Sequence, residues 1–190
     1  MPAAADKEGS RELLRWAEGP VRWLLLPSDW REIKSLESPA EAINFIERFW
    51  DLRDSNWATE ENEYRAVFNA RVDAADQLYG EGDLRGSLTD RGRALILLGP
   101  PPHMQLASED ELVWKPRSQA RQRSTTRALR VEIWRYAAED LSSKLVGVLR
   151  AADREPVVEL KFRLNPSSAK LLEGENSLIL VSRLALVRDD

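Results

Sequence analysis

Gly86-Ser87-Leu88-Thr89-Asp90-Arg91-Gly92-Arg93 marks the point in this sequence where a helical pattern gives way to a strand-like one. Three further motifs flank this stretch in a fixed order. They are Phe49-Trp50 with Arg53-Asp54, then Thr59-x-x-Asn62-Glu63, and last Gly99-Pro100-Pro101 leading on to Glu132-Ile133-Trp134-Arg135-Tyr136. Helices that come first and strands that come later are typical of an α+β fold.

The segments before Gly86 carry the signals of helix starts. Ser28 is the predicted N-cap of a helix over residues 29–36. Ser38-Pro39 is a stronger start, because a capping side chain is followed by proline at the first helical position. The next helix places apolar side chains on one stripe, at the spacing of a core-facing surface. They are Ile43, Ile46, Phe49 and Trp50.

The longest predicted helix covers about residues 60–79, with Thr59 as its N-cap. The acidic residues of its first turn suit the positive end of the helix dipole. One face carries apolar or aromatic residues at helical spacing, and glycines at 80 and 82 end the pattern. The members of that face are Tyr64, Phe68, Val72, Ala75 and Tyr79.

Beyond Gly92 the pattern indicates strands over residues 93–98, 131–136 and 145–149. Residues 158–164 alternate apolar and charged side chains, as in an antiparallel strand with one solvated face. Residues 178–187 fit either a strand or a helix. We therefore predict an α+β fold in which N-terminal helices pack on one face of a mostly antiparallel sheet formed by the C-terminal half.

This organisation predicts a single domain over residues 1–190. Residues 1–10 are expected to form a flexible tail. A short amphipathic helical segment is expected to begin after it, at Glu12. Residues 11–82 are expected to be mainly helical. Residues 93–187 are expected to be mainly β, with a basic inserted loop at about 112–130.

That inserted loop is rich in cations. Between Glu111 and Glu132 there are six basic residues and no acidic one. A solvated loop and docking onto an acidic protein are the main alternatives, and phosphates, anionic lipid or nucleic acid are further ones. The basic residues are Lys115, Arg117, Arg121, Arg123, Arg127 and Arg130, of which the last five are the predicted partner-binding arginines.

Composition narrows the classes of function. The formal net charge of −4 argues against nucleic acid as the main partner, and the absence of cysteine excludes disulfides and thiolate metal sites. No run reaches the roughly 20 apolar residues of a membrane span, and residues 1–5 lack the apolar segment of a signal peptide. Seven tryptophans indicate either an aromatic core or a surface platform for a partner.

Taken together, the four motifs resemble the GWxTD domain, a bacterial module without an established activity. The resemblance covers about residues 16–136. The defining motif reads Gly86-Ser87-Leu88-Thr89-Asp90 here, so Ser87 replaces the motif tryptophan, and Ser55 and Trp57 replace prolines after Arg53-Asp54. Members of that family often begin with an export signal, so the resemblance implies the cell envelope or periplasm, with the cytoplasm left open.

The polar motif residues sit at the ends of predicted elements, between apolar ones. We expect them to converge on one network at the junction of helices and sheet, because arginine pairs well with carboxylates. Such a network either braces the fold or forms a polar cleft for a ligand. The motif residues assigned to it are Trp50, Arg53, Asp54, Thr59, Asn62, Glu63, Thr89, Asp90, Arg91, Gly92, Arg93, Gly99, Pro100 and Trp134.

The residues for catalysis are few. His103 is the sole histidine and follows a proline run, so a nucleophile system would have to use it as the base. We expect a non-enzymatic protein-interaction or structural module of a larger bacterial assembly, without cofactor or metal. The alternative is a hydrolase or carbohydrate-binding domain whose cleft carries Asp54, Asn62, Glu63 and Asp90.

Overall fold

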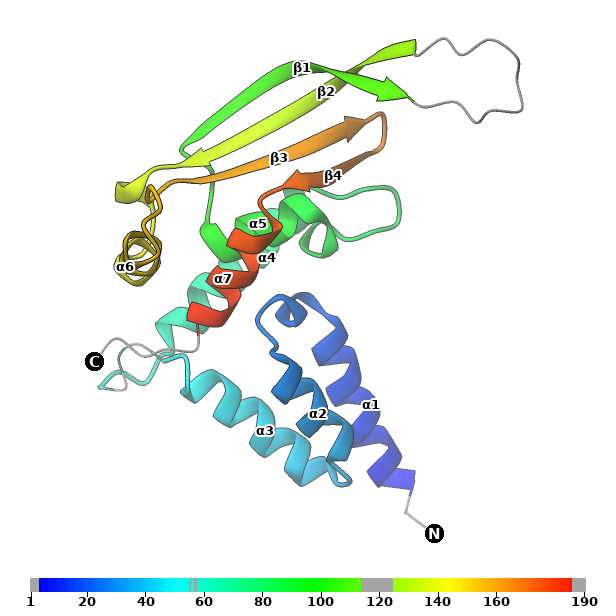
Figure 1. Ribbon diagram of the computed structural model, residues 1–190. Coiled ribbons are helices and arrows are strands. Elements are labelled where there is room, and N and C mark those ends of the chain that lie inside the picture. The colour runs from blue at the N-terminus through cyan, green and yellow to red at the C-terminus, as the bar shows by residue number, and fades with distance from the viewer. Residues whose placement is uncertain (1–3, 55, 57, 114–124, 186–190) are drawn as a thin grey trace. The chain divides into compact units, whose positions relative to one another are not determined.

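The computed structural model describes residues 4–54, 56, 58–113 and 125–185. The chain forms two compact units. A helical unit comprises residues 1–99 with 176–190, and a sheet unit comprises residues 100–175. Helices in the N-terminal part and an antiparallel sheet formed by the C-terminal half confirm the predicted α+β class (Figure 1).

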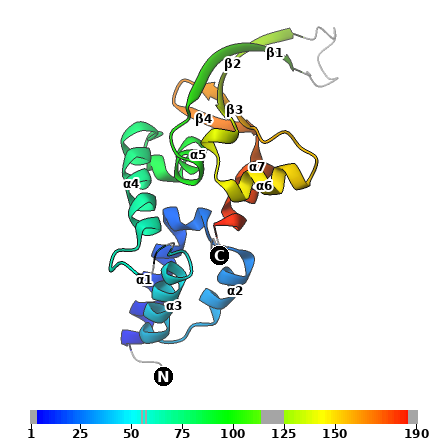
Figure 2. The same cartoon turned by 90° about the vertical axis from the view of Figure 1, so that its left-hand side faces the viewer.

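Helices make up the first unit, and α1, α2 and α3 lie side by side within it (Figures 1 and 2). Two short 3-10 helices, η1 and η2, connect the longer ones. The elements are α1 (Ala4–Glu18), η1 (Pro20–Trp23), α2 (Pro27–Ser35), α3 (Pro39–Asp51), α4 (Glu63–Leu78), η2 (Gly86–Leu88), α5 (Asp90–Leu98) and α7 (Glu175–Leu184).

The first two helices begin earlier than predicted. The backbone is helical from Ala4, so residues 4–10 belong to α1 and not to a tail, as their alanine, lysine and glutamate content favours. In α2, Pro27 takes the first helical position, which suits its fixed φ, and Ser28 lies inside the helix. The Asp29 carboxylate accepts a hydrogen bond from the Leu26 backbone N–H at 2.8 Å and closes this start.

Helix α3 starts as predicted but buries a different stripe. The Ser38 hydroxyl accepts from the Glu41 backbone N–H at 3.2 Å, and the Glu41 carboxylate accepts from the Ser38 N–H at 3.1 Å. Ala42 and Phe45 are buried with Phe49 and Trp50, whereas Ile43 is 57% exposed. The choice follows from α1, whose Trp16 ring packs edge-on against the rings of Phe45 and Phe49.

Helix α4 confirms the longest predicted helix and its face. Phe68 and Ala75 are buried, and the other three predicted members are half-buried. The Trp50 ring packs 5.2 Å from the Phe68 ring, which joins α4 to the aromatic cluster of α3.

Two predicted strands are wrong. Residues 93–98 lie in α5, where Thr89 is the N-cap and Gly99, at φ 87°, follows the last turn. Residues 145–149 lie in α6 (Ser143–Ala151), whose N-cap is Ser142. Both are short apolar runs that fit either structure, and the cap residues decide for helix. Residues 178–184, which were open between strand and helix, are in α7.

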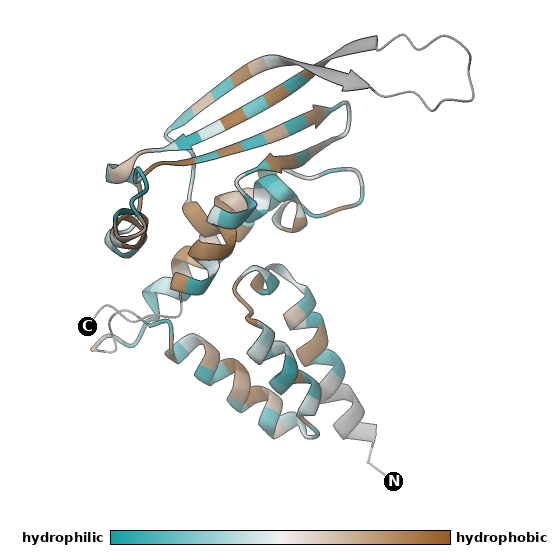
Figure 3. Cartoon of the chain, in the orientation of Figure 1, coloured by the Kyte–Doolittle hydropathy of each residue, from teal (hydrophilic) through white to brown (hydrophobic). Residues whose placement is uncertain are grey.

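The second unit is built on a four-stranded antiparallel sheet with the order β1-β2-β3-β4. β2 and β3 contain the predicted strands at 131–136 and 158–164, and apolar and polar residues alternate along them (Figure 3). Tyr136 pairs with Val158 and Trp134 with Leu160, so these buried residues share one face. The elements are β1 (His103–Val113), β2 (Thr125–Tyr136), η3 (Ala138–Asp140), α6, β3 (Val158–Asn165) and β4 (Ser168–Glu173).

The predicted basic loop is shorter than expected. β1 extends to Val113 and β2 begins at Thr125, so the ends of the predicted 112–130 loop are strand. Their pairing continues to Val113↔Thr125. Arg127 and Arg130 therefore lie in β2, because the antiparallel pairing of β1 with β2 continues without a break as far as Thr125.

Two glycines of the Gly86–Arg93 stretch allow backbones to approach closely. A Cβ at Gly86 would lie 1.8 Å from the Ala75 carbonyl oxygen of α4. A Cβ at Gly92 would lie 1.8 Å from the Gly86 carbonyl oxygen. α4, η2 and α5 are thus packed backbone to backbone, and no larger residue fits at either position without displacing a helix.

Replacing Gly86 with alanine tests this close approach. We expect Gly86→Ala to lower the free energy of unfolding by about 1–3 kcal/mol or more, because overpacking displaces backbone. The matched control is Gly147→Ala in α6, where nothing lies within 4 Å. That exposed helical position should gain about 0.5–1 kcal/mol. Urea denaturation followed by circular dichroism measures both, and a Gly86→Ala protein as stable as the parent would contradict the packing argument.

Candidate functional site

Asn62 joins the end of α3 to the start of α4. Its side-chain oxygen accepts from the Arg65 backbone N–H at 2.8 Å, and its side-chain nitrogen donates to the Trp50 carbonyl oxygen at 2.8 Å. The predicted N-cap Thr59 is therefore wrong, since α4 begins at Glu63 with Asn62 as its cap. Asparagine and threonine are both good N-caps, and the tie to Trp50 selects the asparagine.

Thr59 instead holds the turn that precedes α4. Its hydroxyl donates to Glu63 Oε1 at 2.6 Å and lies 2.7 Å from the Asn56 carbonyl oxygen. The bond from Thr59 lowers the pKa of the Glu63 carboxyl. Asp54 closes a tighter turn by accepting from the Asn56 backbone N–H at 3.0 Å. These side chains shape the loop before α4.

Arg53 is a buried cation, 5% exposed, at the end of α3. Its guanidinium donates to the Phe49 carbonyl oxygen at 2.7 Å and to the Leu24 carbonyl oxygen at 3.4 Å. It also lies 3.5 Å over the Phe49 ring. Burial lowers the pKa of Arg53 to about 10. We predicted that Arg53 would pair with a carboxylate. In the structure its guanidinium instead contacts carbonyl oxygens and an aromatic face.

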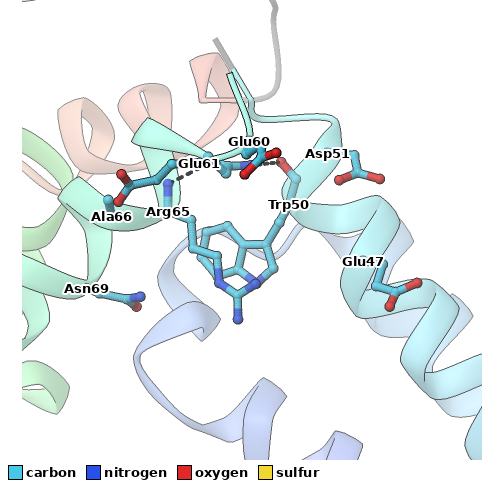
Figure 4. A pocket seen from close by; sticks show the side chains of 9 residues that line it. Glu47, Trp50, Asp51, Glu60, Glu61, Arg65, Ala66 and Asn69 are labelled. Carbon is cyan, nitrogen blue, oxygen red and sulfur yellow. Dashed lines mark hydrogen bonds between the residues drawn. The ribbon is translucent and has the colours of Figure 1, made fainter. Parts of the chain in front are cut away.

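A pocket of about 360 Å³ opens beside this corner of α3 and α4. Trp50 and Arg65 lie at its centre, with the guanidinium 5.4 Å from the middle of the indole ring (Figure 4). The carboxylates around this pair come from α3 on one side and from the segment before α4 on the other (Figure 4). They belong to Glu47, Asp51, Glu60 and Glu61.

The Gly86–Arg93 stretch forms a second polar cluster. Thr89 accepts from the Gly92 backbone N–H at 3.0 Å and donates to the Gly86 carbonyl oxygen at 2.8 Å, which fixes the start of α5. Asp76 of α4 accepts from the Ser87 backbone N–H at 2.8 Å and pairs with Arg85. Burial raises the pKa of Asp76, but the bonds from Ser87 and Arg85 outweigh this effect and lower it.

Two arginines of this stretch lie over aromatic rings. The Arg91 guanidinium is 4.9 Å from the centre of the Tyr79 ring, and the Arg93 guanidinium is 5.1 Å from the centre of the Trp23 ring. Trp23 also donates its indole N–H to the Ser87 carbonyl oxygen at 2.8 Å. Ser87 is fully buried beside it. Asp90 is the acidic residue in the first turn of α5.

The structure thus places the helical motif residues in two clusters rather than in one network. The first holds Trp50, Arg53 and Asn62, and the second surrounds Thr89 and Gly92. The Trp23–Leu24 segment connects them, because Leu24 accepts from Arg53 while Trp23 contacts Ser87 and Arg93. Trp23 was absent from the predicted site. The apolar run at residues 21–26 concealed it, although an indole N–H usually needs a partner.

The remaining motif residues lie elsewhere. Gly99 follows α5, next to the Arg71 guanidinium, which donates to the Ile96 carbonyl oxygen at 3.0 Å. Pro100 begins the sheet unit. In that unit the fully buried Trp134 donates its indole N–H to the Glu132 carboxylate at 2.5 Å.

The predicted basic surface is only partly covered by the structure. Arg117, Arg121 and Arg123 lie outside the described residues, and the described part of Arg127 is its backbone in β2. Arg130 is exposed on β2, where it pairs in register with Ser108 of β1. Its neighbour along the strand, Leu129, is half-buried.

The residues predicted for the alternative carboxylate cleft differ in their relation to the pocket beside Trp50. Of Asp54, Asn62, Glu63 and Asp90, only Asn62 lines the pocket. His103 is exposed at the first position of β1. Across the residues with described side chains, no group of three or more histidine, aspartate or glutamate side chains is arranged to hold a metal ion. None of the described helices is both long and apolar enough to cross a membrane.

Comparisons of the chain with family models, with curated proteins and with solved structures give no match.

The Asp76–Ser87 contact gives a pH-dependent prediction. A lowered pKa means that the carboxylate stabilises the folded chain above pH 3.8 and that this contribution is lost as the pH falls further. Asp76→Asn should therefore lower the free energy of unfolding by about 1 kcal/mol at neutral pH. The difference from the parent should shrink below pH 3.8. Asp73→Asn, an exposed change in the same helix, serves as control in denaturation curves at several pH values, and a constant difference would refute the assignment.

Proposed function

We propose that the chain is a non-enzymatic protein-interaction module and serves as a structural subunit of a larger bacterial assembly. The observation that carries this proposal is the apolar rim of the sheet on β1. Met104 and Leu106 are 62% and 61% exposed there. The resemblance to the GWxTD domain belongs to the same proposal and rests on the sequence motifs alone.

The rim continues a buried apolar face. Met104 pairs in register with Trp134, and Leu106 pairs with Glu132. Paired residues of an antiparallel ladder point to the same side of the sheet. The face that buries Trp134, Leu160 and Phe162 therefore extends onto β1, where the side chains of Met104 and Leu106 are left in water.

The backbone of β1 supports docking of an extended segment. Within the described strands, β1 stands at one edge of the sheet and is 11 residues long. An edge strand presents N–H and C=O groups that can pair with a further strand. A partner added in this way gains main-chain hydrogen bonds along the edge and apolar contacts at alternate residues.

The charge near this edge indicates the chemistry of the partner. Arg130 is exposed and in register with Ser108, which points to the same side as Leu106. Residues 114–124, between β1 and β2 in the sequence, contain cationic but no acidic residues. A segment with alternating apolar residues and acidic ones would match both features.

The double variant Met104→Lys/Leu106→Lys tests the apolar rim. Immobilised parent protein should retain a partner from an extract of the source organism, and the double variant should retain at least about tenfold less, because two lysines cannot be buried under a strand. Leu78→Lys is the matched control, since Leu78 is 64% exposed in the helical unit. Equal retention by the parent and the double variant would exclude the rim.

Charge reversal tests the basic arm separately. We expect Arg121→Glu/Arg123→Glu/Arg127→Glu to weaken binding of the same partner, and to do so more at low salt than at high salt, where screening already suppresses the attraction. Titrations at several salt concentrations measure this difference. Unchanged affinity at low salt would remove the arm from the proposal.

A further inference from the structure

We propose that the pocket beside Trp50 binds residues 114–124 of a second copy of this chain, so that copies associate head to tail. This inference rests on the proposed function and names the acidic partner of the basic arm. Two independent features of the pocket lead to a basic peptide as its occupant.

The first feature is charge. Among the described residues that line the pocket, four carry carboxylates and Arg65 carries the single positive charge. The carboxylates of Glu47, Asp51, Glu60 and Glu61 belong to exposed residues. Their mutual repulsion is relieved when a cation enters, so the pocket favours ammonium or guanidinium groups over anions.

The second feature is an unmet hydrogen-bond donor. Trp50 lines the pocket and is only 4% exposed, and its indole N–H has no acceptor among the residues that the structure describes. A buried donor without an acceptor costs free energy, which a ligand oxygen would recover. The Arg65 guanidinium covers the indole ring and belongs to an exposed side chain that can turn aside. A peptide supplies carbonyl oxygens as well as cations, whereas a simple cation supplies no acceptor.

The chain itself contains a peptide of this kind. Residues 114–124 read Trp-Lys-Pro-Arg-Ser-Gln-Ala-Arg-Gln-Arg-Ser, with four cationic residues and no acidic one. Serine and glutamine between the cations add hydrogen-bonding groups for Asn69 of the pocket. A pocket and a complementary segment at different places on one chain make a heterologous contact, which extends from copy to copy.

Mixing two variants tests this contact. The pocket variant is Glu60→Lys/Glu61→Lys, and the segment variant is Arg121→Glu/Arg123→Glu. By sedimentation velocity at low salt, the parent should form species larger than a dimer, and each variant alone should be monomeric. An equimolar mixture should give a heterodimer and nothing larger, because only one intact pocket and one intact segment remain. Asp73→Lys/Asp83→Lys, with exposed carboxylates outside the pocket, should associate like the parent.

A peptide measurement guards against misfolded variants. A fluorescent peptide of residues 114–124 should bind the parent and bind the pocket variant at least about tenfold more weakly. The same peptide with its cations replaced by glutamine should bind neither protein. Circular dichroism verifies that the variants are folded.

Three results would overturn the inference. They are a parent protein that stays monomeric at low salt, a mixture that stays monomeric, and peptide binding that the pocket variant leaves unchanged. The double variant Met104→Lys/Leu106→Lys should self-associate like the parent. If Met104→Lys/Leu106→Lys loses the partner from the extract while Glu60→Lys/Glu61→Lys leaves self-association unchanged, the proposed function stands and the head-to-tail contact is wrong. If Met104→Lys/Leu106→Lys also keeps the extract partner, both proposals are wrong.

Discussion

The helical unit depends on the hydrogen bonds that hold the Trp23–Leu24 segment. Arg53, at the end of α3, donates to the Leu24 carbonyl oxygen, and the Trp23 indole N–H donates to the Ser87 carbonyl oxygen of η2. Ser182 of α7 donates to the Trp23 carbonyl oxygen at 2.7 Å. A 3-10 helix of four residues such as η1 has little stability of its own. These hydrogen bonds therefore hold η1 in place, and they tie α3, η2 and α7 to the same short segment.

Arg53 and Arg93 of this unit lie against carbonyl oxygens or aromatic faces. Arg53 donates to two carbonyl oxygens, and Arg93 lies over Trp23. Guanidinium groups suit such sites because they are planar and weakly hydrated. At the α3–α4 corner, exposed acidic residues lie around the pocket.

The sequence predicts those elements whose signal is local. Ser38-Pro39 marks the start of α3 because the cap and the proline act within one turn. β3 is predictable because its alternation spans the whole strand. Residues 93–98 and 145–149 are too short for periodicity to decide, and their caps at Thr89 and Ser142 carry the missing information.

The candidate site was harder to predict for a different reason. The order of the motifs groups these residues, but it does not indicate that Arg53 contacts Leu24 and that Arg93 contacts Trp23. Asn62 was found because its role is a local cap as well as a tie to Trp50. The pocket carboxylates were not singled out, since nothing in their spacing separates them from other surface acids.

Helix α7 belongs to the helical unit although the whole sheet unit precedes it along the chain. The sheet unit is thus one continuous stretch of the sequence, inserted between the two stretches that make up the helical unit. During synthesis on the ribosome, residues 100–175 emerge before the serine that bonds to Trp23. The sheet unit can therefore complete its pairing first, while the helical unit waits for its last helix. Shortening the chain from its C-terminus would accordingly damage the part of the protein that is made first.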